Sequence, residues 1–554
     1  MSRPDSIARG VARLVLTAFV ALPVAVRAQA PTDLDRVLHV LNRTSFGPDQ
    51  DEADALLAGA GTLDAKLNTY LDTQMNPLTP ESGPLLTALG TLEIAAAAQG
   101  DPGSLAHLQK SFLLRATCAE LQLRELMTLF WERHFNTAFF VVQSGLSQVG
   151  AESEDYTVWF EREENDYFRE HAFGDFRDLL GYSATNLPML IYLNGATTVA
   201  GSVNENHARE LLELHTMGPA TAGGTPNYDQ GDIQLVAQVL TGWRVAFDPG
   251  PPPSYSVTTE DGKHVDFMGQ QLTLFSVSGS PMTLTPATTA PKVVKDTDSL
   301  LDKLVRRDAT RDFVIRKLMA FFYGDEAAKS VNDPVYQPIL DQAKVAWGFR
   351  GDMQAVLDVL LRAPVFLDAS LAWSRVRTPV EQICWLPRAC GAGIHTASVP
   401  PSTATEAPWL AMLRTPESLF MFPSPDGYPI ESGEQLGAQA YIDRVSFGKL
   451  PHDEFANYVN FYFTHDYFQS LVDFQADMGT PAYKQSGVAA PYLLQRFFGT
   501  AFTPAEQALV VEMLDKDHLG NPSPLSAVPD DIAWAKRMLA AIALIGGLPR
   551  ASTK

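Results

Sequence analysis

Apolar residues recur along most of this chain with the three-to-four-residue spacing of amphipathic helices. The segments with this spacing are 33–43, 51–74, 105–137, 174–182, 229–242, 297–323, 336–349, 352–362 and 503–515. Residues 247–291 depart from it, because they open on a proline-glycine run and continue with short stretches rich in Val, Thr and Phe. Such stretches favour a small β-hairpin or ribbon. The pattern therefore predicts a mainly α protein, a large multi-helix globular body with a small β-rich insertion and long loops.

The chain has 554 residues, of which 46% are hydrophobic, enough for one large or two ordinary globular domains. We expect a single helix-rich domain over residues 31–554, with residues 440–554 as a candidate C-terminal helical subregion. Residues 396–435 are rich in proline and turn sequences. Because loops of that length in a compact protein commonly serve function, this region is a candidate for a substrate-facing lid.

The N-terminal residues have the pattern of a secretory signal peptide. Three arginines precede an apolar run from Leu14 to Val26, and small residues follow at Ala28 and Ala30. We expect residues 1–28 to be removed, with cleavage after Ala28 or Ala30, and the protein to be exported to the periplasm or the extracellular space. No later apolar run is long enough to span a membrane, so a soluble mature protein is expected.

Charge and cysteine content narrow the classes of partner. The formal net charge is -22, and removing residues 1–28 deletes four arginines and one aspartate, so it moves by -3 to -25. Nucleic acids and anionic membranes bind basic surfaces, so neither is expected as a partner. Cys118, Cys384 and Cys390 allow at most one intramolecular disulfide. Cys384 and Cys390 would lie roughly 9 Å apart along an unbroken helix, too far to bridge, but Pro387 between them leaves the pairing open.

Residues 204–243 hold the densest group of polar side chains and are predicted to form a helical hairpin. The first helix is expected to begin with a capping box of Ser202 and Glu205 and to end at Gly218. The side chains that share its buried stripe by spacing are Ala208, Leu211, Leu212 and His215. Tyr228, Asp229 and Asp232 are expected to cap the second helix.

Glu205, Arg209 and Glu213 follow one another at four-residue intervals on another face of the first helix. If this ladder is solvated, each ion pair contributes a few tenths of a kcal/mol. If it is buried, Arg209 holds Glu205 and Glu213, and Glu210 remains as the unpaired acid. An unpaired carboxylate in a partly apolar cleft has a raised pKa and can act as a general acid or base. Both interpretations are open at this stage.

Residues 204–214, Asn-Glu-Asn-x-x-Arg-Glu-Leu-x-Glu-Leu, are followed by a glycine loop and a helix that ends in Leu-Thr-Gly-Trp at 240–243. This arrangement resembles the signature of the bacterial family called domain of unknown function 1800. Further blocks in the family's order are 41–48, 123–127, 130–135, 176–180, 313–318 and 356–366. Members of this family are often encoded beside proteins of domain of unknown function 1501, which resemble sulfatases and phosphatases. The resemblance therefore implies a possible partner without naming an activity.

His134 lies in the block Trp131-Glu132-Arg133-His134-Phe135, on one apolar face of a predicted helix. A buried histidine of this kind usually donates a hydrogen bond to a backbone carbonyl. The other interpretation makes it a base or a metal ligand, and the resemblance favours it because the family's pattern also has histidine here. On that interpretation Glu210 and Glu213 should approach His134.

Metal and cofactor sites are left open by the sequence. His207 and His215 are two helical turns apart, roughly 12 Å along the axis, which is too far for one ion to be held by both. His207 and Glu210 are three residues apart, and a metal site that used them would need further ligands from elsewhere in the chain. The nucleotide-binding, nucleophile-elbow, zinc-protease and haem motifs are absent from the sequence. Tyr428 either stacks on a sugar ring or fills the core.

Two classes of function follow. The first is an exported enzyme that uses acid/base or metal-assisted chemistry on an extracellular polymer or metabolite, with Glu210, Glu213, Arg209 and His134 at its centre. The second is a non-catalytic binding or assembly partner of a co-encoded sulfatase-like or phosphatase-like protein. Carboxylates and His134 that line one closed pocket would favour the enzyme, and a broad exposed apolar patch would favour the partner.

Overall fold

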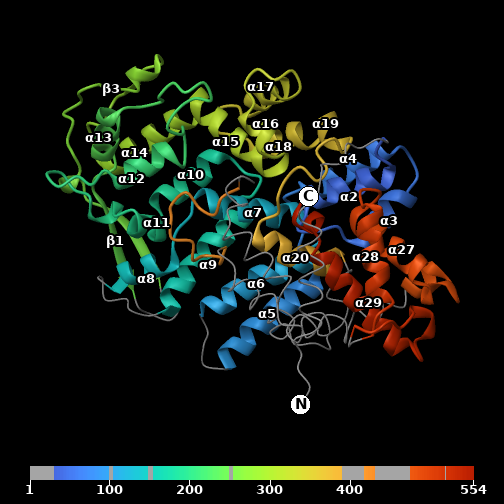
Figure 1. Cartoon of the computed structure of the whole chain (residues 1–554). Helices are drawn as coiled ribbons and strands as arrows, with labels where there is room; N and C mark the ends of the chain where they lie inside the picture. The colour runs from blue at the N-terminus through green and yellow to red at the C-terminus, as the bar shows by residue number, and fades with distance from the viewer. Residues whose placement is uncertain are drawn as a thin grey trace.

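The computed structural model describes residues 30–98, 104–147, 154–248, 254–389, 417–430, 474–517 and 520–554. The predicted signal peptide and Cys390 lie outside the described residues. The chain folds into a mainly α structure with a small β part, which confirms the fold class predicted from the periodicity. Figure 1 shows the first and last described helices side by side at one end and the strands at the other.

The helices before the strands are α2 (Asp33–Thr44), α3 (Gln50–Ala58), α4 (Leu63–Gln74), α5 (Gly83–Ala98), α6 (Leu105–Cys118), α7 (Gln122–His134), α8 (Phe139–Ser147), α9 (Glu154–Glu170), α10 (Phe176–Thr185), α11 (Leu187–Tyr192), α12 (Asn206–Glu213) and α13 (Gln230–Val239). Those after the strands are α14 (Lys292–Val305), α15 (Asp308–Phe322), α16 (Asp325–Lys329), α17 (Tyr336–Ala346), α18 (Met353–Leu361), α19 (Pro364–Leu367), α20 (Pro379–Ala389), α27 (Ser486–Phe498), α28 (Pro504–Leu514) and α29 (Asp531–Gly546).

Three segments predicted as single helices are each divided in two, and one of them, 297–323, breaks between α14 and α15. The segment 51–74 breaks between α3 and α4, where Gly61 has φ +100°, a conformation that favours glycine. The segment 105–137 breaks between α6 and α7, because Ala119 is extended at the end of α6. Helical periodicity continues across these breaks, so the pattern of apolar residues alone did not reveal them.

The β part consists of two short antiparallel pairs. Strand β1 (Trp243–Asp248) pairs with β2 (Ser254–Thr259), with Trp243 opposite Thr259. Strand β3 (Leu272–Leu274) pairs with β4 (Met282–Leu284) and buries both leucines of β3. The predicted insertion is therefore present, although β1 begins four residues earlier than expected, directly after the Leu-Thr-Gly that ends the second predicted helix.

The buried apolar side chains of the described residues fall into one large cluster and several smaller ones. The large cluster runs from α2 through α20 and includes Leu419 and Phe420 of the segment 417–430. The second largest joins Trp385 of α20 to α27, α28 and α29. Because α20 contributes to both clusters, it connects the C-terminal helices to the main body.

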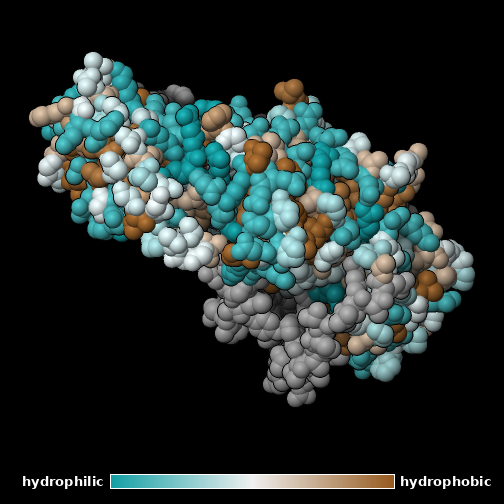
Figure 2. Space-filling view, turned by 90° about the horizontal axis from the view of Figure 1, so that it is seen from above, coloured by the Kyte–Doolittle hydropathy of each residue, from teal (hydrophilic) through white to brown (hydrophobic). Residues whose placement is uncertain are grey.

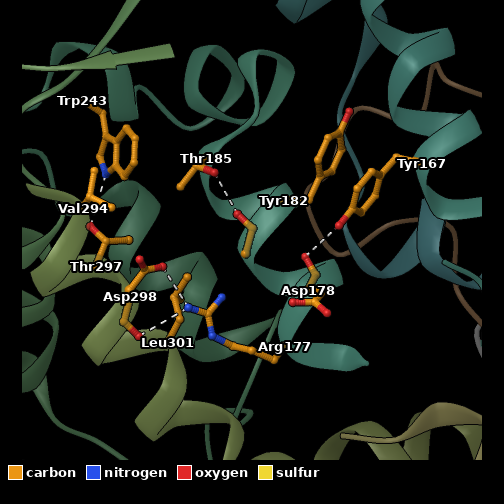
Figure 3. Close-up of a pocket in the computed structure, with 11 residues that line it drawn as sticks. Tyr167, Arg177, Asp178, Tyr182, Thr185, Trp243, Val294, Thr297, Asp298 and Leu301 are labelled. Atoms are coloured by element: carbon orange, nitrogen blue, oxygen red, sulfur yellow. Dashed lines mark hydrogen bonds and ion pairs between the residues drawn. The ribbon is translucent and has the colours of Figure 1, made fainter. Parts of the chain in front are cut away.

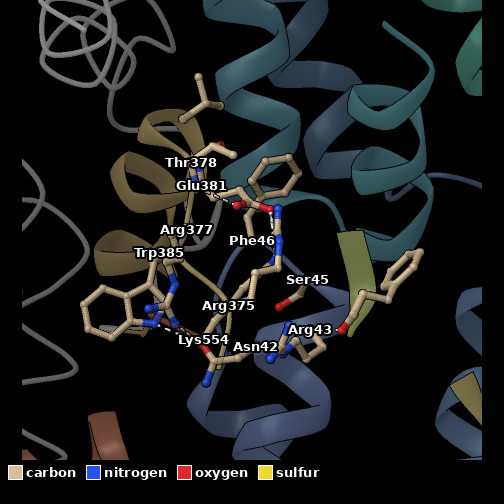
Figure 4. A network of polar contacts seen from close by, with 12 residues as sticks. Asn42, Arg43, Ser45, Phe46, Arg375, Arg377, Thr378, Glu381, Trp385 and Lys554 are labelled. Atoms are coloured by element: carbon tan, nitrogen blue, oxygen red, sulfur yellow. Dashed lines mark hydrogen bonds and ion pairs between the residues drawn. The ribbon is translucent and has the colours of Figure 1, made fainter. Parts of the chain in front are cut away.

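The buried contact between these parts is strongly cationic (Figure 4). Arg375 donates to Glu381 Oε1 at 2.9 Å, and the Lys554 ammonium lies 2.9 Å from the same oxygen. Arg377 donates to Asn42 Oδ1 at 2.5 Å and to the Ala551 carbonyl at 2.7 Å. The network therefore connects α2, α20 and the segment around 551–554, with Glu381 as the carboxylate at its centre.

A second buried polar cluster consists of three glutamates, Glu132 of α7 and Glu161 and Glu164 of α9. Thr137 donates to Glu164 at 3.2 Å and lies 3.3 Å from Glu161, so these two carboxyl groups share one hydroxyl. Asn165 donates to Glu132 at 2.7 Å. Burial, followed by the charge of Glu164, raises the pKa of Glu132 to about 8.

Of the predicted loop region 396–435, the structure describes residues 417–430. Cys118 and Cys384 are free thiols, and burial raises the pKa of the Cys118 thiol to about 12.

Within the described ranges, no helix combines the length and apolar character needed to cross a membrane.

Candidate functional site

The predicted helical hairpin is present, but its first helix is shorter than expected. Helix α12 begins at Asn206 with Glu205 at the N-cap, and the Glu205 side chain makes no capping hydrogen bond, so the predicted capping box of Ser202 and Glu205 is wrong. Ser202 instead lies in a tight turn, in which its backbone N–H donates a hydrogen bond to the Val199 carbonyl at 2.9 Å. Asn204 Oδ1 accepts from the Asn206 amide at 2.9 Å, so this neighbouring side chain satisfies the start of the helix.

Helix α12 also ends early, at Glu213, and the chain then forms a wider turn. The amide of His215 bonds to the Glu210 carbonyl and that of Met217 to the Leu212 carbonyl. Gly218 follows with φ +69°, and a Cβ placed there would lie 2.6 Å from the Phe313 ring. His215 is buried as predicted, although it lies in this turn and not on the helix.

The cap of α13 agrees with the sequence prediction. Asp229 accepts from the Asp232 amide, and the Asp232 carboxylate accepts from the Asp229 amide. The neighbouring Tyr228 hydroxyl lies 3.4 Å from Glu213 and donates to it. Glu213 is therefore held by the loop before α13.

The ladder on α12 is solvated. Arg209 pairs with Glu205 at 3.3 Å, with 40% and 32% of the two side chains exposed, and it also donates to Gln230 at 3.4 Å. The partner of Glu213 is Tyr228, so no arginine clamp holds Glu205 and Glu213 together. The buried alternative for the ladder does not apply.

We expect Arg209→Ala to lower the free energy of unfolding by less than about 1 kcal/mol, because exposed ion pairs contribute little. Urea denaturation followed by circular dichroism measures this difference. A loss of about 3 kcal/mol or more would mean that a desolvated network depends on Arg209, in disagreement with its exposure.

Glu210 is half-buried and is the unpaired carboxylate of this group. Among the described residues, no hydrogen bond or ion pair engages its side chain. Burial, followed by the charge of Glu213, raises its pKa, while Arg209 acts in the opposite direction. Asp426 also contributes to the increase. Glu210 is thus a carboxyl group whose protonated form is favoured relative to an ordinary glutamate.

Asp426 reaches this site from the segment 417–430, which is fixed to α7 and α11. Asn136 donates to the Ser424 carbonyl at 2.8 Å, and the Tyr192 hydroxyl donates to the Pro423 carbonyl at 2.7 Å. The next residue, Gly427, has φ +72°, and a Cβ there would collide with the Arg133 carbonyl. The backbone around Asp426 is therefore positioned by close contacts on both sides.

Tyr192 lies at the same site. Burial, then the charges of Glu210 and Asp426, raises the pKa of its hydroxyl to about 12. Tyr428 from the same loop is buried and packs against Phe422, with ring centroids 5.6 Å apart. Tyr428 therefore fills the core, which is one of the two roles considered for it.

Lys317 of α15 is a cation close enough to Asp426 for the two charges to interact. Burial lowers the pKa of its ammonium to about 8, and Asp426 opposes that shift. Its Nζ lies 5.5 Å from the centroid of the Phe313 ring. An amine with such a pKa is partly neutral at physiological pH and can accept a proton.

His134 lies in an aromatic core. It is buried, and its Nε2 donates to the His215 carbonyl at 3.1 Å. Its ring stacks on Phe130 with centroids 6.0 Å apart. Burial, then the charges of Lys317 and His215, holds its pKa well below the ordinary value. In the described chain no hydrogen bond joins His134 to Glu210 or Glu213, and its contacts are those of a core histidine.

His207 and His215 are buried in the same region. Burial lowers the pKa of His207 to about 4, and burial with the charge of His207 lowers that of His215 to about 3. Both imidazoles are therefore neutral at physiological pH. Among the described residues, no three His, Cys, Asp or Glu side chains are grouped closely enough to hold a metal ion.

Of the residues selected from the sequence, Glu210, Glu213 and Arg209 lie together at this site, whereas His134 lies in the aromatic core. Asp426 and Lys317 were missed. Asp426 belongs to Ser-Pro-Asp-Gly-Tyr-Pro, which has the composition of an ordinary turn, although a lysine within the apolar face of α15 was a usable signal.

Comparison with known proteins identifies the family of this chain. No curated protein and no solved structure gives a significant match. The blocks noted in the sequence, including the α12 and α13 signature, fall within residues 39–545, which match a single family model. That model is described as protein of unknown function (DUF1800), and because the match covers nearly the whole chain, this protein belongs to that family.

Proposed function

We propose that this protein is an exported enzyme that uses acid/base chemistry on an extracellular polymer or metabolite. The observation that carries the proposal is a group of three ionisable side chains, Glu210, Asp426 and Lys317. They come from α12, the segment 417–430 and α15, and Asp426 acts electrostatically on both of the others. Within the described chain, none of the three has a hydrogen-bonded or ion-paired partner.

Each of the three groups has a distinct chemical role in this proposal. Glu210 is the general acid, because its raised pKa keeps it protonated at a higher pH than an ordinary carboxyl group. Lys317 is the base, because a pKa of about 8 leaves a neutral fraction at physiological pH. Asp426 stabilises the ammonium after proton uptake. Tyr228 and Arg209 keep Glu213 and Glu205 occupied, so Glu210 is left for the substrate.

We expect Glu210→Gln to lower the turnover of a substrate by about 100-fold or more, since proton transfer by a positioned side chain contributes on this scale. Glutamine keeps the size of glutamate but cannot exchange a proton. Turnover is measured on a panel of chromogenic esters, phosphate esters and glycosides, with the variant compared at equal folded concentration.

The matched control is Glu205→Gln, which removes a carboxylate from the same helix at a site paired with Arg209. It should keep turnover close to the wild-type value. Wild-type turnover in the Glu210→Gln protein would remove this residue from the mechanism. Retained turnover in Lys317→Met would show in the same way that the amine is not the base.

A second candidate function is binding to a partner, such as a co-encoded protein of domain of unknown function 1501. The observation that favours it is the exposure of Val345 and Phe349 at the end of α17, at 82% and 77%. On the face shown in Figure 2, however, apolar side chains are scattered among hydrophilic ones. If Val345→Glu with Phe349→Glu abolishes co-purification of that protein while Glu210→Gln has no effect, the binding role is favoured.

A further inference from the structure

A surface pocket of about 370 Å³ lies between α10 and α14, away from the α12 site (Figure 3). Helix α10 contributes Tyr182 and Thr185, helix α14 contributes Thr297 and Asp298, and Trp243 at the start of β1 lies between them. Pockets that bind small molecules have volumes of about this size and larger. The pocket shares no residue with the proposed acid/base group.

Aromatic rings form part of the wall. Tyr167 of α9 and Tyr182 are stacked, with ring centroids 3.7 Å apart and planes within 7° of each other. Trp243 is fixed on the opposite side, because its indole N–H donates to Thr297 Oγ1 at 3.3 Å. Figure 3 shows the tyrosine pair and the tryptophan on opposite sides of the pocket. Aromatic faces carry negative charge density and attract the polarised C–H groups of a ligand.

The charged side chains that line the pocket are all in ion pairs. Arg177 donates to Asp298 at 2.9 Å and to Asp302 at 2.5 Å. Asp178 is paired with Arg350 from the loop before α18. A charged ligand would therefore have to displace an existing ion pair, whereas a neutral ligand would not.

The polar groups nevertheless offer acceptors of hydrogen bonds. The side chain of Asp298 is 59% exposed, and its two oxygens can accept further hydrogen bonds. Thr297 is only 2% exposed, and its hydroxyl holds Trp243 in place by accepting from the indole N–H. Thr185 donates to the Gly181 carbonyl at 2.8 Å and retains acceptor capacity.

We propose that this pocket binds a neutral carbohydrate ring. A sugar ring presents C–H groups on its faces and hydroxyl groups, which both donate and accept, around its edge. The aromatic wall formed by Tyr182 and Trp243 suits the faces, and Asp298 with Thr185 suits the edge. The pocket is a binding site distinct from the proposed reaction centre, and it stands independently of that proposal.

The test uses the purified full chain and three neutral oligosaccharides, cellotriose, maltotriose and diacetylchitobiose, in isothermal titration calorimetry. At least one of them should bind with a dissociation constant in the millimolar range or tighter. Asp298→Ala and Tyr182→Leu should each weaken that binding at least about tenfold, a change of about 1.4 kcal/mol. Tyr182→Leu keeps an apolar side chain but removes the aromatic face.

The matched control is Asp358→Ala, an ion-paired aspartate on α18 that is 52% exposed and does not line the pocket. It should bind the sugar as the wild type does. Circular dichroism melts show whether each variant is folded, and Asp298→Ala supplies the test if Tyr182→Leu does not fold. Absence of binding for all three sugars, or binding unchanged in Asp298→Ala, would overturn the proposal, as would tighter binding of tetramethylammonium than of any sugar.

Discussion

Glu381→Gln is expected to lower the free energy of unfolding by about 3–5 kcal/mol, because it leaves buried cations without their carboxylate. Glu381 is 1% exposed and accepts bonds from Arg375, Lys554 and the Thr378 amide. Burial alone would raise its pKa, but Arg375 and Lys554 outweigh this effect and hold it well below the ordinary value. The carboxylate is therefore ionised in the folded protein, and its loss affects every cation around it.

The surrounding arginines make this site unusually sensitive. Arg43 and Arg377 are fully buried, and their guanidinium groups are held by carbonyl oxygens and by Asn42. These neutral acceptors do not replace the lost negative charge. Urea denaturation followed by circular dichroism measures the effect as a lower midpoint.

The matched control for Glu381 is Glu260→Gln. Glu260 also pairs with an arginine, Arg244 at 3.0 Å, but its side chain is 55% exposed. Its substitution should cost less than about 1 kcal/mol, because solvent screens the pair. Equal losses in the two variants would contradict the view that burial makes the Glu381 pairs important.

Glu132→Gln should change the free energy of unfolding in a way that depends on pH. At high pH it should raise this free energy, whereas Glu381→Gln lowers it. Burial and the charge of Glu164 raise the pKa of Glu132 from 4.5 to about 8, so the folded protein binds a proton that the unfolded chain releases. Its stability contribution is present below about pH 4.5 and is lost as the pH rises through about 8. At about 1.4 kcal/mol for each unit of pKa, the loss at this site is on the order of 5 kcal/mol.

Glutamine resembles the protonated carboxyl group and keeps the oxygen that accepts from Asn165. The variant should therefore match the wild type near pH 4, where Glu132 is protonated in both the folded and the unfolded chain, and be more stable than it near pH 9. Urea midpoints of both proteins at the two pH values measure this, and the difference between them cancels pH effects from the buried histidines. A variant less stable than the wild type at the higher pH would show that the ionised glutamate is stabilised in the fold.

The mainly α class, the positions of most helices and the β insertion were accessible from the sequence, because they depend on local periodicity and turn chemistry. The cap of α13 is an example, since Asp229 and Asp232 are three residues apart and satisfy each other. The start of α12 shows the limit. Ser202 has the right spacing for a cap, but a turn with Val199 engages its backbone.

The exposure of the α12 ladder could not be decided by spacing. Four-residue intervals place Glu205, Arg209 and Glu213 on one face, but whether solvent or protein covers that face depends on distant segments. In the folded protein Arg209 remains 40% exposed, and Tyr228 from the following loop binds Glu213.

The sequence by itself determined the family of this chain, its helical architecture and the concentration of polar residues around Glu210. Only the tertiary structure brought Asp426 close enough to act on both Glu210 and Lys317, and it placed His134 in an aromatic core with a hydrogen bond to the His215 carbonyl. The physical reason is that a pKa and a hydrogen-bond partner depend on burial and on charges brought together from distant parts of the chain. Periodicity specifies which residues share a helix face, but long-range packing decides what that face meets.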